Sequence, residues 1–191
     1  RDVELRWPVD SDDPEISTTV FAPDVWHEII EGAHASAEPG VLFWDTAKKF
    51  TPADIYADEG FGSVSTNPCG EIILSPYDSC RLMLVNLTGF IKNRWKKNSK
   101  FDFKLFSKTV QKAQRLMDDM VDIEIEQVEK IIEKIDNDPE STEVKQIEKD
   151  LWTNIQTMAE LGRRTGLGIT GLGDAMAMLG LQYGGKKSIK L

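Results

Sequence analysis

The stretch STNPCGEIILSPYDSC, residues 65–80, contains both cysteines of the chain. Pro68 fixes the backbone before the first cysteine, Cys69, and Gly70 allows a sharp turn after it. This pattern predicts a thiol that is presented at the tip of a loop. The common alternative for a lone cysteine is a buried side chain that packs inside a turn, and the local sequence leaves both interpretations open.

Three side chains of different chemistry stand at alternate positions of this stretch, namely the amide of Asn67, the thiol of Cys69 and the carboxylate of Glu71. If the segment is extended, all three point to the same side. A neighbouring carboxylate disfavours a thiolate nucleophile. It suits chemistry in which the sulfur exchanges a hydrogen atom while the carboxylate moves a proton. A structural zinc site is not indicated, because it needs four ligands and neither His27 nor His34 lies near in sequence.

The composition limits the class of protein. Of the 191 residues, 40% are hydrophobic and 29% are charged, which indicates a folded chain rather than a disordered one. The formal net charge of −9 argues against a nucleic-acid polymer as a partner. We find no stretch of about 20 apolar residues that would cross a membrane, and no signal peptide. Two cysteines are too few for a disulfide framework, so we expect reduced thiols in a cytoplasmic protein.

The order of the expected elements is that of an α/β protein with a helix-rich second half. A helix is predicted for residues 22–36, because Pro23 stands at its start and apolar residues follow at helical intervals. Residues 41–44 (VLFW) are predicted as a short buried run, and residues 81–90 as a strand with an exit turn. Two long helices are expected at about 103–135 and 141–164, with a charged face exposed to solvent.

A glycine-rich motif lies near the end of the chain. GLGITG, residues 166–171, matches the G-x-G-x-x-G pattern of dinucleotide-binding folds, but a polar helix precedes it and no acidic residue follows at the required distance. We therefore predict a tight backbone passage from a helix into a strand and back into a helix. Arg163 and Arg164 could contact phosphate. Alternatively, they lie there because the dipole at the C-terminus of a helix favours positively charged side chains.

Several motifs together resemble one protein family. TNPCGE, followed by Cys80 and then VNL, resembles the active-site finger loop of ribonucleotide reductase catalytic subunits. EPGVLFWDT before it, and FDFKLFSKTVQKAQRLMDD and GRRTGLGITGLGD after it, agree in order, so the resemblance spans most of the chain. The N-P-C-G-E core and the short gap to the second cysteine are most similar to class II, the adenosylcobalamin-dependent (vitamin B12-dependent) reductases.

The resemblance implies a fold. The family has a ten-stranded α/β barrel of two half-sheets, with the finger loop at its centre. Residues 1–191 would form a partial catalytic barrel domain from the middle of the family chain. Its finger loop would lie at about 65–80, its helical region at about 103–164 and its glycine-rich segment at 162–173. We expect that such a piece does not close a barrel alone and leaves apolar stripes exposed.

The resemblance also implies a radical mechanism in which a cofactor, adenosylcobalamin, supplies the difficult chemistry. Cys69 would carry a thiyl radical that takes the 3′-hydrogen of a ribonucleoside di- or triphosphate. Glu71 would act as the base on the 3′-hydroxyl, and Asn67 would bind the sugar hydroxyls. The reaction would yield 2′-deoxyribonucleotides for DNA synthesis.

Further residues and partners follow from the same resemblance. Cys80 matches one member of a redox-active cysteine pair whose other member lies outside this chain, and Ser65 and Thr66 would bind substrate. A thioredoxin-like protein or another dithiol would re-reduce the pair, and the remaining segments of the reductase and a second copy in a homodimer are expected partners. No metal ligand is expected among these residues.

Three alternatives stay open. The chain could come from a class I reductase, which receives its radical from a separate small subunit. It could be a catalytically incomplete fragment or an interaction module. Finally, Cys69 and Cys80 could form a disulfide with each other, because the loop length permits it, although this would consume the thiol that carries the radical.

Overall fold

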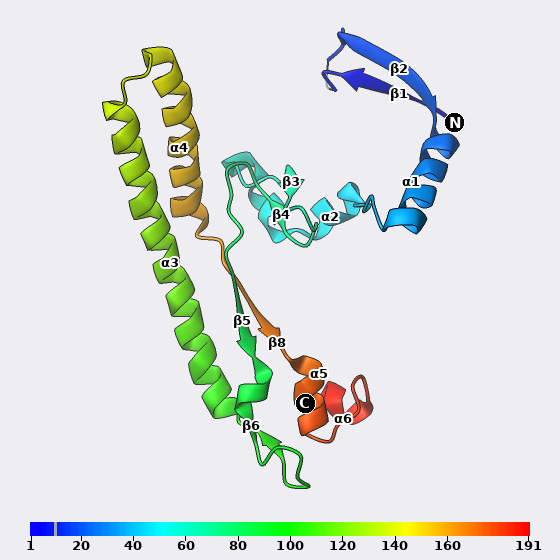
Figure 1. Cartoon of the computed structure of the whole chain (residues 1–191), viewed down its shortest axis with the longest axis vertical. Coiled ribbons are helices and arrows are strands. Elements are labelled where there is room, and N and C mark those ends of the chain that lie inside the picture. The colour runs from blue at the N-terminus through cyan, green and yellow to red at the C-terminus, as the bar shows by residue number, and fades with distance from the viewer. Residues whose placement is uncertain (10) are drawn as a thin grey trace. The chain divides into compact units, whose positions relative to one another are not determined.

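The computed structural model describes residues 1–9 and 11–191. The chain divides into two compact units, Arg1–Ala47 and Lys48–Leu191, called here the N-terminal and the C-terminal unit. The described strands form four separate two-stranded sheets, and they do not close a barrel (Figure 1). The chain therefore has the mixed helix and strand content that the sequence predicts, as a set of open pieces.

The N-terminal unit consists of a hairpin and a helix. Strand β1 (Asp2–Trp7) pairs antiparallel with β2 (Ile16–Phe21), from Asp2 opposite Phe21 to Trp7 opposite Ile16. Helix α1 (Ala22–Ser36) follows directly, with a proline in its first turn, as predicted. It ends where Ala37 adopts a left-handed conformation (φ 64°) and its N–H donates to Ala33 O. None of the described residues of this unit is buried.

The prediction of a buried run at residues 41–44 is wrong. Val41, Leu42 and Phe43 are 48%, 51% and 73% exposed, and Trp44 is the first residue of a short helix, α2 (Trp44–Phe50). An apolar run is buried only where another element packs against it. The sequence pattern shows that this run is apolar, but it does not show whether another helix or strand packs against it.

The pocket described below lies beside a short hairpin in the C-terminal unit. A 3₁₀ helix, η1 (Pro52–Glu59), leads to the two-residue strands β3 (Ser65–Thr66) and β4 (Ile73–Leu74), which pair antiparallel. Asp54 in η1 accepts hydrogen bonds from Ser63 N–H (2.9 Å) and Ser63 Oγ (2.6 Å). These bonds lower the pKa of the Asp54 carboxyl and fasten η1 to the start of the hairpin.

Glycines shape the one parallel pair of strands among the described residues. Strand β5 (Leu82–Asn86) pairs with β8 (Gly166–Thr170), in a register that places Leu82 opposite Gly166 and Leu84 opposite Gly168. A Cβ added at these two glycines would lie 2.7 and 2.9 Å from the Cδ2 atoms of the opposing leucines. The G-x-G pattern therefore makes room for leucine side chains, and the predicted passage from helix through strand to helix is confirmed.

The third glycine of the motif makes a turn against the end of β5. Asn86 Oδ1 accepts from Thr88 N–H (3.0 Å) and Thr88 Oγ1 (2.8 Å), which caps the 3₁₀ helix η2 (Leu87–Phe90). Gly171 has φ 71°, and a Cβ there would lie 2.7 Å from the same Oδ1 atom. Glycine is therefore required where the chain passes Asn86 into helix α5 (Leu172–Met178).

A small apolar core lies around η2 and α5. Strand β6 (Ile91–Lys92) pairs antiparallel with β7 (Lys100–Phe101), and a short helix, α6 (Lys186–Lys190), lies near the C-terminus. The rings of Phe90 and Phe106 meet edge to face with centroids 5.3 Å apart. The buried cluster and the side chains packed on it are Leu87, Ile91, Ala175, Phe101, Phe106, Leu172, Met178 and Leu179.

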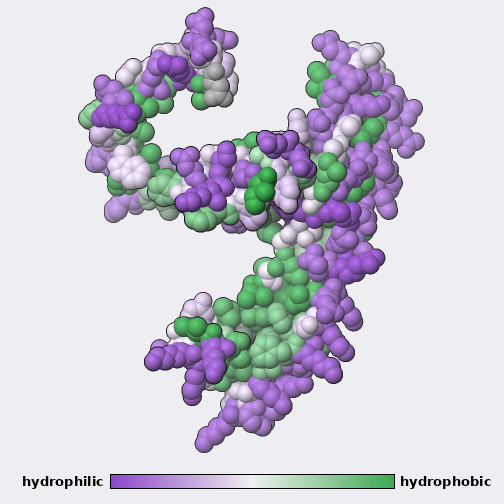
Figure 2. Space-filling view, turned by 180° about the vertical axis from the view of Figure 1, so that it is seen from behind, coloured by the Kyte–Doolittle hydropathy of each residue, from purple (hydrophilic) through white to green (hydrophobic). Residues whose placement is uncertain are grey.

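Two long helices form an antiparallel hairpin, as predicted. Helix α3 (Phe103–Asn137) starts at Asp102, whose carboxylate accepts from Leu105 N–H, and α4 (Thr142–Gly162) starts at Ser141, whose hydroxyl accepts from Val144 N–H. The buried residues of the pair are Met117, Val121, Val128, Ile135 and Ala159. Their spacing is typical of an amphipathic helix, and Figure 2 shows the largely hydrophilic outer surface of these helices.

One face of the C-terminal unit is apolar and uncovered. Figure 2 shows hydrophobic surface in the lower part of the view, over the region of β5, β8 and α5. Leu82, Leu84 and Ile169 are 54%, 60% and 50% exposed there. Exposed apolar surface of this kind marks a site of association. None of the helices in the described part of the chain combines the length and the apolar character that crossing a bilayer requires.

Candidate active site

The first cysteine lies in the tight turn of the β3–β4 hairpin. Asn67 N–H donates to Ile72 O (3.2 Å), Ile72 N–H donates to the side-chain Oδ1 of Asn67 (2.9 Å), and Gly70 N–H donates to Asn67 O (3.0 Å). Gly70 has φ 76°, which favours glycine. Cys69 is an exposed free thiol between the exposed Pro68 and this glycine. The prediction of a thiol at a loop tip is therefore confirmed.

The condition under which residues 67, 69 and 71 would share a side, an extended segment, is not met. Asn67 and Gly70 close a turn, so side chains do not alternate across this segment. The amide oxygen of Asn67 binds the turn's own backbone. The three groups still lie within one short turn, and of the three only Glu71 lines the neighbouring pocket.

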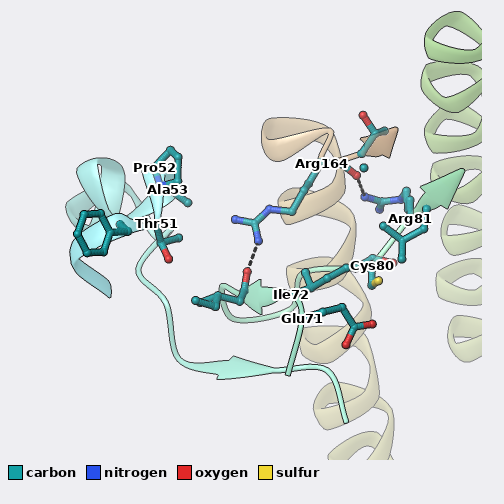
Figure 3. A pocket seen from close by; sticks show the side chains of 14 residues that line it. Thr51, Pro52, Ala53, Glu71, Ile72, Cys80, Arg81 and Arg164 are labelled. Atoms are coloured by element: carbon teal, nitrogen blue, oxygen red, sulfur yellow. Dashed lines mark hydrogen bonds between the residues drawn. The ribbon is translucent and has the colours of Figure 1, made fainter. Parts of the chain in front are cut away.

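The second cysteine lies beside that pocket, which has a volume of about 590 Å³ (Figure 3). Glu71 and Cys80 both line it, so the structure brings these two predicted site residues together. The pocket walls come from residues 50–53, 71–73, 79–82 and 164–166. Cys80 is an exposed free thiol, and the alternative disulfide with Cys69 is not formed.

Ser65 and Thr66, the predicted substrate-binding residues, form strand β3 and do not line this pocket. Ser65 is exposed, Thr66 is half-buried, and Ser65 Oγ donates to Thr66 O at 3.3 Å. Their role in binding substrate stays a prediction. No group of three His, Cys, Asp or Glu side chains gathers as a metal site within the described ranges 1–9 and 11–191.

A buried arginine follows Cys80 directly. The Arg81 side chain is only 6% exposed, and its Nε and Nη2 bind the two carboxylate oxygens of Glu124, on α3, at 2.5 and 2.7 Å. Its Nη1 donates to Arg164 O at 3.0 Å. A two-point pair of this kind fixes both position and orientation of the guanidinium. Arg81 therefore joins the start of β5 to α3 and to the segment that leads into β8.

A second arginine, Arg164, reaches the hairpin from the segment between α4 and β8. Arg164 Nη1 donates to Ile73 O at 2.6 Å, as Figure 3 shows, and its Nε lies 3.0 Å from Asp78 Oδ2. The Asp78 side chain is 4% exposed; its Oδ2 makes this ion pair but no well-aligned hydrogen bond, and its Oδ1 accepts from Ser79 N–H at 2.8 Å. The Arg164 guanidinium is thus held by groups of the protein itself.

Arg163 is held in the same way. It ends α4 in a left-handed conformation (φ 42°), and its guanidinium pairs with Asp118 and Asp122 on α3, each at 2.8 Å. Hydrogen bonds from the guanidinium to Asp122 and Asp118 raise the pKa of Arg163. Neither a phosphate contact nor the helix dipole is needed to explain either arginine, because carboxylates of the chain neutralise both.

The sequence analysis missed Arg81, Asp78 and Glu124. One signal was present, since Arg81 opens an otherwise apolar strand and a buried charge requires a partner. The identity of that partner was not readable, because Glu124 lies 43 residues further along the chain.

The comparisons with known proteins agree with the motifs. Residues 6–191 match the family described as "Ribonucleotide reductase, barrel domain". The vitamin B12-dependent ribonucleoside-diphosphate reductase of Thermoplasma acidophilum is 27% identical over 180 residues, which covers 93% of this chain and 19% of that protein. The protein of the same name from Mycobacterium tuberculosis (strain CDC 1551 / Oshkosh) is 29% identical over 171 residues, or 89% of this chain and 20% of that protein.

A further relative is the putative adenosylcobalamin-dependent ribonucleoside-triphosphate reductase of Mycobacterium phage D29. It is 34% identical over 84 residues, which is 44% of this chain and 11% of that protein. No solved structure gives a significant match. The chain spans about one fifth of the length of the curated relatives that it matches over most of its own length. With 186 of 191 residues inside the match (6–191), the chain belongs to the ribonucleotide reductase barrel domain family.

Proposed function

We propose that this chain carries the finger loop of a vitamin B12-dependent ribonucleotide reductase, which reduces ribonucleotides to 2′-deoxyribonucleotides. The observation that carries the proposal is the exposed free thiol of Cys69 at the tip of a closed turn, in a chain of this family. The names of the relatives, which specify vitamin B12 or adenosylcobalamin, support the class.

The proposed chemistry assigns one task to each residue of the turn. Cys69, as a thiyl radical, takes the 3′-hydrogen of the substrate and returns it at the end of the reaction. Glu71 accepts the proton of the 3′-hydroxyl. Asn67 binds the turn backbone through its amide oxygen, which leaves its N–H groups as donors to a sugar hydroxyl.

Cys80 supplies reducing equivalents in this proposal. The 2′-hydroxyl leaves as water, and a hydrogen takes its place on the sugar. The two electrons and two protons come from Cys80 and a second cysteine elsewhere in the enzyme, which become a disulfide. A thioredoxin-like protein or another dithiol then reduces that disulfide. The pocket that holds both Glu71 and Cys80 supports this arrangement, because the proton acceptor and the reductant face the same space.

Adenosylcobalamin, when bound, supplies the radical chemistry that a protein side chain cannot start by itself. The turn fits such a group in one respect, because a large ring can approach a sulfur that is exposed and not paired with a second sulfur. Pro68, Cys69 and Gly70 would be the residues of this chain that contact it.

The proposal extends to the fold of the assembled enzyme, and the open edges of the two-stranded sheets support it. We propose that the strands of this chain belong to a ten-stranded α/β barrel, completed by other segments of the reductase. The exposed leucines on β5 support this, since a barrel neighbour would cover them. A ribonucleoside di- or triphosphate as substrate, a homodimer and a cytoplasmic location belong to the same proposal.

The test uses the full-length reductase that contains this chain, with adenosylcobalamin, a ribonucleoside diphosphate and a dithiol. We expect Cys69→Ser to reduce turnover by at least about 1000-fold, as removal of a reacting group does, while Ser107→Ala, at an exposed position of α3 outside the pocket, keeps most of it. Equal turnover by Cys69→Ser and the unmodified enzyme would disprove the radical role. If turnover does not depend on adenosylcobalamin but requires a separate small subunit, the chain belongs to a class I reductase instead.

A further inference from the structure

The segment that carries Cys80 is anchored on both sides by buried charges. The side chain of Asp78, two residues before it, is 4% exposed, and the side chain of Arg81, directly after it, is 6% exposed. Cys80 itself is exposed at the pocket. An exposed thiol is thus carried by a short stretch of backbone whose two ends are held in place.

The two anchors belong to one network. Arg81 binds Glu124 through two nitrogens and donates its third, Nη1, to the carbonyl oxygen of Arg164. Arg164 in turn pairs with Asp78 and donates to Ile73 O. The network therefore connects α3, the start of β5, the segment before β8 and the β3–β4 hairpin, and Cys80 lies in the sequence between its members Asp78 and Arg81.

The network is balanced in charge, with two guanidinium groups and two carboxylates. Arg81 and Arg164 both line the pocket that Cys80 lines (Figure 3). Removal of one member of a buried pair leaves its partner as an uncompensated charge in a region of low dielectric. Such a charge would act on a thiol that lines the same pocket. The charged groups that line the pocket with Cys80 are Glu71 from the hairpin and Arg81 and Arg164, and Glu124 and Asp78 are the ion-pair partners of these two arginines.

We propose that Asp78, Arg81, Arg164 and Glu124 position Cys80, and that by neutralising one another these four groups add no net charge of their own to the pocket that its thiol shares with Glu71. The inference rests on the proposed role of Cys80 as a redox cysteine. That role requires a sulfur that forms a disulfide and is then released. A bare cation beside it would hold it as a thiolate, and a bare carboxylate would hinder thiolate formation.

The proposal predicts effects of opposite sign. Asp78→Asn leaves Arg164 unbalanced, so Cys80 should be alkylated about 3- to 10-fold faster at neutral pH. Arg164→Gln leaves Asp78 unbalanced, so alkylation should be slower by a similar factor. The double variant should return to within about 2-fold of the unmodified protein, because the charges are removed together.

The experiment follows alkylation of Cys80 by iodoacetamide as a function of pH in the pre-reduced full-length reductase, with the Cys80 peptide quantified by mass spectrometry. Arg115→Gln is the matched control, since Arg115 forms a surface pair with Asp119 and is 79% exposed. We expect it to leave the profile unchanged. Arg164→Lys keeps the positive charge, so it should give the same alkylation profile as the unmodified protein. This comparison can be made even if Arg164→Gln fails to fold.

Two outcomes overturn the proposal. If Asp78→Asn and Arg164→Gln change the alkylation rate of Cys80 in the same direction, the network only holds the loop closed, because loosening a loop exposes the thiol in either variant. If neither variant changes the rate, or if Arg164→Lys behaves as Arg164→Gln does, the charges do not act on Cys80. Alkylation needs no turnover, so either result is separate from the test of Cys69 and of the reductase activity.

Discussion

The two units of the chain form regular elements with very different degrees of burial. In the N-terminal unit, β1, β2 and α1 have complete patterns of backbone pairing, yet none of the described residues is buried. In the C-terminal unit, α3 alone buries Met117, Val121, Val128 and Ile135. The same apolar periodicity therefore accompanies a core in one unit and an exposed surface in the other.

This difference shows what an amphipathic pattern does and does not establish. It predicts the helix or strand, because the pattern and the backbone share a period. It does not say whether the apolar face has a partner within the chain. A two-stranded hairpin and a single helix are marginal without such a partner, so the N-terminal unit should be the less protected against amide hydrogen exchange.

The largest effect is expected in the core of the helical hairpin. Met117 is 1% exposed between α3 and its neighbours, so Met117→Ala leaves a cavity and should lower the free energy of unfolding by about 2–5 kcal/mol. Chemical denaturation followed by circular dichroism measures it. Leu116, the adjacent residue, is 53% exposed, and Leu116→Ala should cost less than about 1 kcal/mol. Similar losses in both variants would contradict the helix orientation.

The next effect concerns the glycine-rich segment. Gly171→Ala places a Cβ 2.7 Å from Asn86 Oδ1 at a residue with φ 71°, so we expect a loss of about 1–3 kcal/mol in the free energy of unfolding. Gly173 is the control, since a Cβ there meets nothing within 4 Å. Gly173→Ala, inside α5, should be neutral or stabilising by up to about 1 kcal/mol. Thermal unfolding of both variants distinguishes a local clash from a general intolerance of alanine.

A smaller, pH-dependent effect is expected at the start of α3. Hydrogen bonds from Lys92 and from Leu105 N–H lower the pKa of Asp102. Because the folded-state pKa lies below the unfolded value of about 4, the stabilisation is present above that pH and is lost as the pH falls through the folded-state pKa. Asp102→Asn keeps the cap but not the charge, so its unfolding midpoint should converge with that of the unmodified chain in acid. If the two unfolding midpoints differ by the same amount at all pH values, the charge of Asp102 is not the source of the stabilisation.

The smallest effect is expected in α1. Trp26 is 52% exposed, so Trp26→Ala should change the free energy of unfolding by less than about 0.5 kcal/mol despite the size of the side chain. Val121→Ala, which removes less volume from a fully buried position, should cost more. A loss above 1 kcal/mol for Trp26→Ala would show that the N-terminal unit buries this ring, and would end the contrast between the two units.

Local signals made much of the fold predictable. The apolar periodicity predicted the two long helices to within a few residues, and in the structure Asp102 and Ser141 cap them. The glycine spacing, with no buried strand before it, distinguished β8 from a dinucleotide-binding loop. Contacts between distant segments were not predictable in this way. The pair of Arg81 and Glu124, and the exposure of residues 41–43, depend on which elements meet in space.

In the candidate site too, features set by the local sequence were predictable and contacts between distant segments were not. The flanking Pro68 and Gly70 predicted that Cys69 would lie at a loop tip, because both act on the local backbone. The shared side expected for residues 67, 69 and 71 failed, because the Asn67 side chain binds Ile72 N–H and closes a turn. The pocket shared by Glu71 and Cys80 also has Arg164 in its lining, and no local sequence pattern connects this arginine to residues 65–80.

The pairing of β5 with β8 also has a consequence for synthesis on the ribosome. Leu82 lies opposite Gly166, so 84 residues separate the two partners in the chain. At about 5–20 residues per second, the second strand follows the first by roughly 4 to 17 seconds. During that interval the nascent chain carries β5 without its hydrogen-bonding partner, which makes this strand the natural place for a chaperone to protect.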